Sequence, residues 1–141
     1  MKDANTYLTF NGNCRDAMKF YADCLGAELQ LMPFGEAPGP DGKPFAQEFR
    51  DRIMHARLSK GKVTLMASDT MPGMPFQAGN NFSIALDCES GQEVDNLFNA
   101  LSQSGKVSMP PQETFWTGRF GMLTDQFGIN WMFNFDKPQQ H

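Results

Sequence analysis

Few side chains in this sequence combine reactivity with a setting that suits a site, and the two candidate catalytic residues are Glu113 and His55. Glu113 precedes an aromatic run that ends at Trp116. Apolar neighbours that desolvate a carboxyl group raise its pKa and prepare it for proton transfer; alternatively, Glu113 is a surface or dimer-contact acid. His55 lies in a predicted strand, where its pKa suits a general base, although such a histidine is more often a structural residue of the sheet.

Six further side chains are expected to line a ligand pocket. Pockets are mostly apolar with a few placed polar groups, and methionine tolerates varied ligands because it fills irregular space. For any single methionine, core filling is the simpler account. Asp69 closes a predicted strand, and capping the following turn is a simpler role for it than catalysis. The predicted ligand-binding residues are Tyr7, Met66, Asp69, Trp116, Arg119 and Met132.

Composition excludes several classes of partner. The chain has 141 residues and a net charge of −4, whereas nucleic acids and anionic membranes select basic surfaces. No apolar run is long enough to span a bilayer, and the N-terminus lacks the apolar core of a secretory signal, so we expect a cytoplasmic protein. Cys14, Cys24 and Cys88 lack the C-x-x-C spacing of zinc or redox sites and are read as reduced.

The elements that must position these residues follow from periodicity and turn chemistry. In the first half, apolar residues at helical spacing begin at Cys14, and Gly26 is placed to end that helix. The Gly- and Pro-rich segment 35–44 is either a lid over a site or an ordinary surface loop. The predicted strands of this half cover residues 6–10, 27–34, 48–58 and 63–68.

The second half follows a Gly/Pro connector, and its helix is the most clearly marked element. Ser90 and Glu93 match a capping box, and the helix closes at Ser104-Gly105. Strands are predicted over 81–87 and 106–109, and the second is interrupted by Pro110-Pro111 and resumes toward Trp116. A hairpin then occupies 112–135, with turns at Gly118 and 125–128.

The two halves share one order of elements, a strand, a helix and three strands, which predicts an α+β fold of two βαβββ modules. We expect a cup-shaped mixed sheet with the helices on the outside. The domain boundaries follow: a single domain over 1–141, with module 1 at about 4–70, a connector at 71–79 and module 2 at about 80–136. Because neither module covers both faces of its sheet, the modules must pack together, within the chain or across a dimer.

With this duplication, several motifs make the whole chain resemble the PhnB-like branch of the vicinal oxygen chelate superfamily, which includes glyoxalase I and the bleomycin resistance proteins. The combination of QETFW and D-x-F-G-x-x-W-M is specific to that branch. A demethylubiquinone methyltransferase label is sometimes attached to this domain, but the glycine-rich loop of a Rossmann-type methyltransferase is missing. The motifs are Tyr7-Leu-Thr-Phe-Asn-Gly-Asn13, Phe20-Tyr21, Leu25-Gly26, Met54-His55-Ala56, Ser68-Asp69, Gln112-Glu-Thr-Phe-Trp116, Phe120-Gly121 and Thr124-Asp-Gln-Phe-Gly128.

The resemblance implies a divalent metal held by His and Glu side chains near the first and last strands of both modules. The family's D-P-x-G-x-x-x-E pattern falls on 125–132, so Met132 replaces the ligand glutamate. Thioether, amide and phenyl groups cannot replace carboxylate and imidazole for such metals. We therefore expect no metal and no cofactor. The other three positions are occupied by Thr6 or Tyr7, by Asn81 or Phe82, and by Met66 or a near neighbour.

Three functions remain open, in this order. The first is a protein that binds a small organic molecule in an aromatic and methionine-lined cup. The second is a metal-independent glyoxalase-type lyase or isomerase that uses Glu113 or His55 as acid or base, and the third is its divalent-metal-dependent counterpart. A homodimer is implied by analogy with the family. No nucleic-acid or membrane partner is expected.

Overall fold

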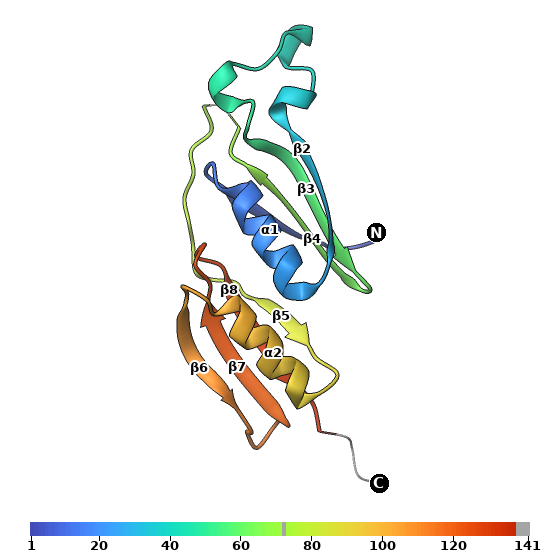
Figure 1. Ribbon diagram of the computed structural model, residues 1–141, viewed down its shortest axis with the longest axis vertical. Coiled ribbons are helices and arrows are strands. Elements are labelled where there is room, and N and C mark those ends of the chain that lie inside the picture. Colours follow the sequence, from blue (N-terminus) through green and yellow to red (C-terminus); the bar gives the residue numbers. More distant parts are fainter. Residues whose placement is uncertain (72, 138–141) are drawn as a thin grey trace. The chain divides into compact units, whose positions relative to one another are not determined.

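The structure is a computed structural model that describes residues 1–71 and 73–137. The chain divides into two compact units, Met1–Gln77 and Ala78–His141. Each unit contains a strand, a helix and three further strands in that order (Figure 1). Among the described residues, no helix has both the length and the apolar character needed to cross a membrane.

The first unit is a four-stranded sheet with one helix on one face. The strands follow the order β1-β4-β3-β2, and only the pair β1 and β4 is parallel. Helix α1 buries Met18 and Tyr21 on the side of the sheet that carries Leu8 and Leu58 (Figure 1). The elements are β1 (Thr6–Phe10), α1 (Cys14–Leu25), β2 (Glu28–Pro33), β3 (Ile53–Lys60) and β4 (Val63–Asp69).

The second unit repeats this arrangement. Its order is β5-β8-β7-β6, with β5 and β8 parallel and the other pairs antiparallel. Helix α2 packs Val94 and Phe98 on the face that carries Trp131 and Phe133, and the Phe98 and Phe133 ring centroids are 5.5 Å apart. The elements are β5 (Ile84–Asp87), α2 (Gly91–Leu101), β6 (Lys106–Gln112), β7 (Arg119–Thr124) and β8 (Asn130–Phe135).

The predicted end of α1 and start of α2 are confirmed, whereas α2 ends at Leu101, before the predicted Ser104-Gly105. Gly26 follows α1 with φ 64°, the left-handed conformation that glycine adopts without steric cost. At the start of α2, the Ser90 hydroxyl accepts a hydrogen bond from the Glu93 N–H at 3.0 Å. The Glu93 carboxylate accepts one from the Glu89 N–H at 3.1 Å, so serine and glutamate each satisfy a free donor. The βαβββ duplication and the α+β class are therefore confirmed.

Three strand predictions are wrong in detail. The strand predicted from Glu48 begins at Ile53, because the preceding residues form a 3₁₀ turn, Gln47–Phe49, in which the Arg50 N–H bonds the Gln47 carbonyl. Short 3₁₀ turns also occupy Phe34–Glu36 and Pro40–Gly42 in the long loop.

In the second unit, β5 begins at Ile84 rather than Asn81. The strand β6 runs through Pro110-Pro111 instead of stopping there. It tolerates the prolines because it stands last in its sheet and its register with β7 shifts between Met109 and Gln112.

Candidate functional site

Each helix covers one face of its sheet, and the opposite face carries several predicted site residues. In the first unit, Tyr7 of β1 is the register partner of Met66 in β4. His55 of β3 shares this face, and its ring centroid lies 6.2 Å from that of Tyr7. Tyr7 is 49% exposed. The structure therefore brings Tyr7, Met66 and His55 together on one open face.

Part of the open face of the second unit is apolar. Met132 of β8 pairs with Met122 of β7, and both are half-buried. Phe120 stands two residues before Met122, on the same face. The ring centroids of Trp116 and Phe120 are 6.1 Å apart, in an edge-to-face arrangement. These four residues, Trp116, Phe120, Met122 and Met132, are called the Met–aromatic face.

The loop that carries Trp116 is fixed by the residue after it. Thr117 is buried, and its hydroxyl lies 2.6 Å from both the Phe135 carbonyl and the Asn134 side-chain oxygen. The Gly118 N–H donates to the same Phe135 carbonyl at 2.8 Å. These bonds connect the loop to the end of β8 and position Trp116 beside the sheet.

At the strand positions where relatives are expected to bind a metal, this chain has no imidazole and no carboxylate. In the first unit these positions are Tyr7 and Met66, and in the second unit Met132 pairs with Ala85. Asn81 or Phe82 was predicted at the ligand position on the first strand of the second unit, but both residues precede β5. Within each unit's described residues, no three His, Cys, Asp or Glu side chains are grouped as metal ligands.

The side chain of Asp69 is buried, and its carboxylate is bonded to the backbone of its own unit. The side chain is 2% exposed. One carboxylate oxygen accepts hydrogen bonds from the N–H groups of Gly12 (2.7 Å) and Cys14 (3.0 Å), and the other accepts one from Ile53 (2.8 Å). Asn13 makes no side-chain cap to α1, so Asp69 satisfies this helix terminus from across the unit. The carboxylate is fully engaged with backbone donors.

Arg119 lies away from the Met–aromatic face. Its guanidinium Nε donates to the Asp95 carboxylate of α2 at 2.6 Å, and both side chains are about one-third exposed. Residues alternate between the two faces of a strand, so Arg119 shares the helix side of β7 with Gly121. It contributes to the packing of α2 rather than to the open face.

Glu113 is a surface residue. Its carboxylate forms an ion pair with Lys137, and the side chain is 63% exposed. The hydrogen bond and the charge of Lys137 hold the pKa of Glu113 below its ordinary value of 4.5. The raised pKa that a general acid needs is therefore not found, because the aromatic neighbours do not cover this carboxylate.

The thiols of Cys14 and Cys88 are protonated at neutral pH. Burial, with a smaller contribution from the charge of Asp69, raises the pKa of Cys14 to about 12. Burial and the nearby Glu93 carboxylate raise the pKa of Cys88 to about 11. A reactive thiolate requires a lowered pKa, so neither residue has the environment of a nucleophile.

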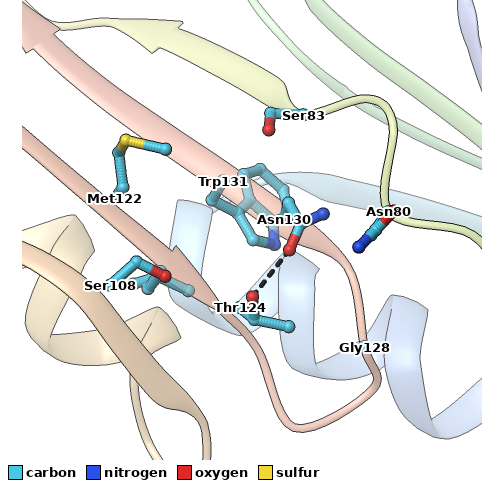
Figure 2. Close-up of a pocket in the computed structure, with 9 residues that line it drawn as sticks. Asn80, Ser83, Ser108, Met122, Thr124, Gly128, Asn130 and Trp131 are labelled. Carbon is cyan, nitrogen blue, oxygen red and sulfur yellow. Dashed lines mark hydrogen bonds between the residues drawn. The ribbon is translucent and has the colours of Figure 1, made fainter.

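A pocket of about 360 Å³ lies entirely within the second unit. Figure 2 shows the side chains of Thr124 and Asn130 pointing toward each other, joined by a 2.6 Å hydrogen bond. Met122 belongs both to this pocket and to the Met–aromatic face, so the two are continuous. The lining residues are Asn80, Ser83, Ser108, Met122, Leu123, Thr124, Gly128, Asn130 and Trp131.

The polar side of this pocket was not predicted from the sequence. Ser, Thr and Asn residues are common on surfaces and carry no motif of their own. One signal was available: Met122 and Thr124 alternate in the hairpin strand, and Asn130 opens the facing strand, which places all three on one face. The positions of Ser83 and Ser108 depend on strand ends that the sequence did not locate.

Comparison with known proteins identifies relatives of the whole chain. The family model described as 3-demethylubiquinone-9 3-methyltransferase matches residues 2–133. Protein YjdN of Escherichia coli K12 is 40% identical, over 94% of this chain and 95% of YjdN. The crystal structure of PA1353 from Pseudomonas aeruginosa is 44% identical, with a TM-score of 0.87, over 98% of this chain and all of that one.

More distant structures define the branch and the fold. A putative 3-demethylubiquinone-9 3-methyltransferase, a PhnB protein from Bacillus cereus, is 26% identical with a TM-score of 0.73, over 95% of this chain and 99% of that one. A glyoxalase/bleomycin resistance protein/dioxygenase family enzyme from Burkholderia phytofirmans shares the fold, with 16% identity and a TM-score of 0.64, over 95% of this chain and all of that one. The chain therefore belongs to the 3-demethylubiquinone-9 3-methyltransferase family; it is similar to a PhnB protein and shares the fold of glyoxalase/bleomycin resistance/dioxygenase proteins.

Proposed function

We propose that this PhnB-like protein binds a small organic molecule on the Met–aromatic face, without the metal site of the superfamily's enzymes. One observation carries the proposal: Met132 stands between Ala85 and Met122, where a ligand carboxylate is expected in metal-dependent relatives. Removal of partly exposed apolar side chains from water by a ligand lowers the free energy and so favours binding. Methionine and aromatic groups accommodate ligands of varied shape.

Proton transfer by Glu113 is not part of this proposal. Its carboxylate is exposed and paired with Lys137, and its lowered pKa keeps it ionised at neutral pH. A general acid at neutral pH needs the opposite shift.

His55 supports a second candidate function, a glyoxalase-type proton transfer, because it lies beside Tyr7 on an open sheet face. Turnover of the hemithioacetal of methylglyoxal and glutathione that is lost in His55→Gln would favour it.

Methyl transfer, named in the description of the family, is also left out of the proposal. A Rossmann-type methyltransferase binds its cofactor at a glycine-rich loop after the first strand of a parallel sheet. Here β1 leads into α1 through Asn11-Gly12-Asn13, and each sheet is mixed.

Native mass spectrometry of the full chain, purified without chelator or added metal, tests the proposal first. The expected species is a metal-free dimer, bare or with an organic adduct. One divalent ion per site would contradict the metal-free reading and would favour a metal-dependent enzyme.

A fluorescence titration then locates the binding surface. The probe is N-phenyl-1-naphthylamine, a neutral apolar dye whose emission rises in an apolar site. Met132→Glu introduces a charge into the Met–aromatic face and is expected to weaken dye binding at least tenfold, because burying an unpaired carboxylate is costly. Met74→Glu is the matched control, since Met74 is 62% exposed and lies in the other unit. Equal dye binding by both variants would contradict the proposal.

A further inference from the structure

We propose that the pocket beside the Met–aromatic face binds the uncharged, hydroxyl-bearing part of the ligand, whose apolar part lies on Met122. This inference rests on the proposed function and adds the chemical class of the ligand: a neutral molecule that joins an apolar group to hydroxyl or carbonyl groups. A volume of about 360 Å³ is at the small end for ligand pockets and suits one compact polar group.

The lining has no ionisable side chain. Its polar members are two serines, a threonine and two asparagines, and none of the nine residues is Asp, Glu, Lys, Arg or His. An ion that enters such a site loses hydration and meets no opposite charge, which makes its transfer unfavourable. A neutral hydroxyl or carbonyl group exchanges its bonds to water for bonds to hydroxyls and amides at little net cost.

Three of the polar side chains are available to a ligand. Asn80, Ser83 and Ser108 are exposed, and in the part of the chain that the structure describes none of their side chains has a hydrogen bond to another protein group. Together they offer an amide and two hydroxyls, which donate and accept. A molecule with several hydroxyl or carbonyl groups matches this mixture better than a group that only accepts.

The other two polar side chains are oriented by the fold. The Thr124 hydroxyl lies 2.6 Å from the side-chain oxygen of Asn130 (Figure 2). The Asn130 amide nitrogen donates to the Phe82 carbonyl at 3.3 Å. These bonds fix the orientation of the Asn130 amide and leave its oxygen with a second lone pair. The pocket thus has an ordered polar wall before any ligand binds.

Local backbone features shape the opening. Ser108 lies between Val107 and Met109, where the register of β6 with β7 shifts, and such irregularities redirect side chains. Gly128, at φ 87°, completes the β7–β8 turn and contributes no side chain to the pocket.

A pair of matched probes tests the inference on the full chain. Phenyl β-D-glucopyranoside carries a neutral sugar on an apolar ring, and phenyl β-D-glucuronide replaces one hydroxymethyl group with a carboxylate. We expect the neutral glucoside to shift the amide resonances of Ser83, Ser108 and Thr124 in ¹H–¹⁵N spectra, and the glucuronide to bind at least tenfold more weakly. Ser108→Ala is expected to weaken glucoside binding roughly fivefold, the effect of one neutral hydrogen bond.

Ser102→Ala, at the end of α2 and outside the pocket lining, is the control and should leave glucoside binding unchanged. Three results would each overturn the inference. They are equal binding of the two probes, a glucoside affinity of Ser108→Ala equal to that of the wild type, and no shift of the amide resonances of the pocket residues. Suppose that N-phenyl-1-naphthylamine binds and Met132→Glu weakens its binding, while the glucoside does not bind at the pocket. That result would refute only the proposed ligand class and would leave the proposed function standing. Loss of both would refute both.

Discussion

Replacing Asp69 with asparagine is the most direct test of how the first unit is held together. The substitution keeps the size and shape of the side chain but removes its charge and one acceptor. In the native protein the carboxylate receives three backbone N–H groups, from Gly12, Cys14 and Ile53. In Asp69→Asn, one side of the amide becomes an NH₂ group, which cannot accept from an N–H donor.

The magnitude follows from these three contacts. A hydrogen bond to a charged group contributes about 1.5–3 kcal/mol, and a buried donor left without a partner costs about 1–3 kcal/mol. Asp69 is only 2% exposed, so water cannot readily replace the lost acceptor. One lost hydrogen bond and two weakened ones give a destabilisation of about 3 kcal/mol. This corresponds to a roughly 100-fold larger equilibrium constant for opening of the first unit.

The assay must report on the first unit. Trp116 and Trp131 both belong to the second unit, so tryptophan fluorescence alone would miss the effect. Amide hydrogen exchange of Gly12, Cys14 and Ile53, together with urea unfolding followed by circular dichroism, measures it directly. The exchange rates of these amides are expected to rise roughly 100-fold, in line with the estimated 3 kcal/mol.

Asp87→Asn is the matched control, because Asp87 also ends a strand but is exposed. Exposed substitutions of this kind usually change stability by less than about 0.5 kcal/mol. If Asp69→Asn were no more destabilising than Asp87→Asn, or if faster exchange appeared only in the second unit, the carboxylate would not have the structural role described.

Two further predictions concern the second unit. Asp125 is 4% exposed, and its carboxylate accepts hydrogen bonds from the Phe127 and Ile129 N–H groups and, at 2.8 Å, from the Trp131 indole N–H. Asp125→Asn should therefore lower the free energy of unfolding by about 2 kcal/mol, measured by urea unfolding followed by tryptophan fluorescence. An unchanged urea midpoint would contradict this. Lys137→Ala should raise the pKa of Glu113 toward 4.5 in a ¹³C titration of its carboxyl group, because Lys137 causes the lowered value. Since that pKa is depressed on folding, any stability from the pair is present above pH 4.5 and lost as the pH falls, and a Glu113 pKa unaffected by Lys137→Ala would refute the assignment.

Features encoded by neighbouring residues were predictable from the sequence. The Ser90 and Glu93 cap, the Gly26 helix end and the 125–128 turn each depend on groups a few residues apart. Such local chemistry leaves a readable pattern. The duplication of the βαβββ order followed from it, and with it the fold class.

Features that depend on partners far along the chain were not predictable in the same way. The partner of Glu113 is 24 residues away, and so is the partner of Arg119. No periodicity identifies Lys137 or Asp95 as the side chain that meets each of them. For the same reason the sequence suggested that Asp69 caps the following turn, which was wrong, because its carboxylate bonds the start of α1 and of β3 instead.

The prolines of β6 have a consequence for self-association. A strand at the end of a sheet presents unpaired N–H groups that can template another strand and begin an amyloid-like stack. Pro110 and Pro111 have no N–H group, so the row of donors along β6 is interrupted there, and β5, at the opposite end of the same sheet, has only four residues. The second sheet is therefore poorly suited to growth by strand addition at either end, which protects its apolar strands β7 and β8 from aggregation.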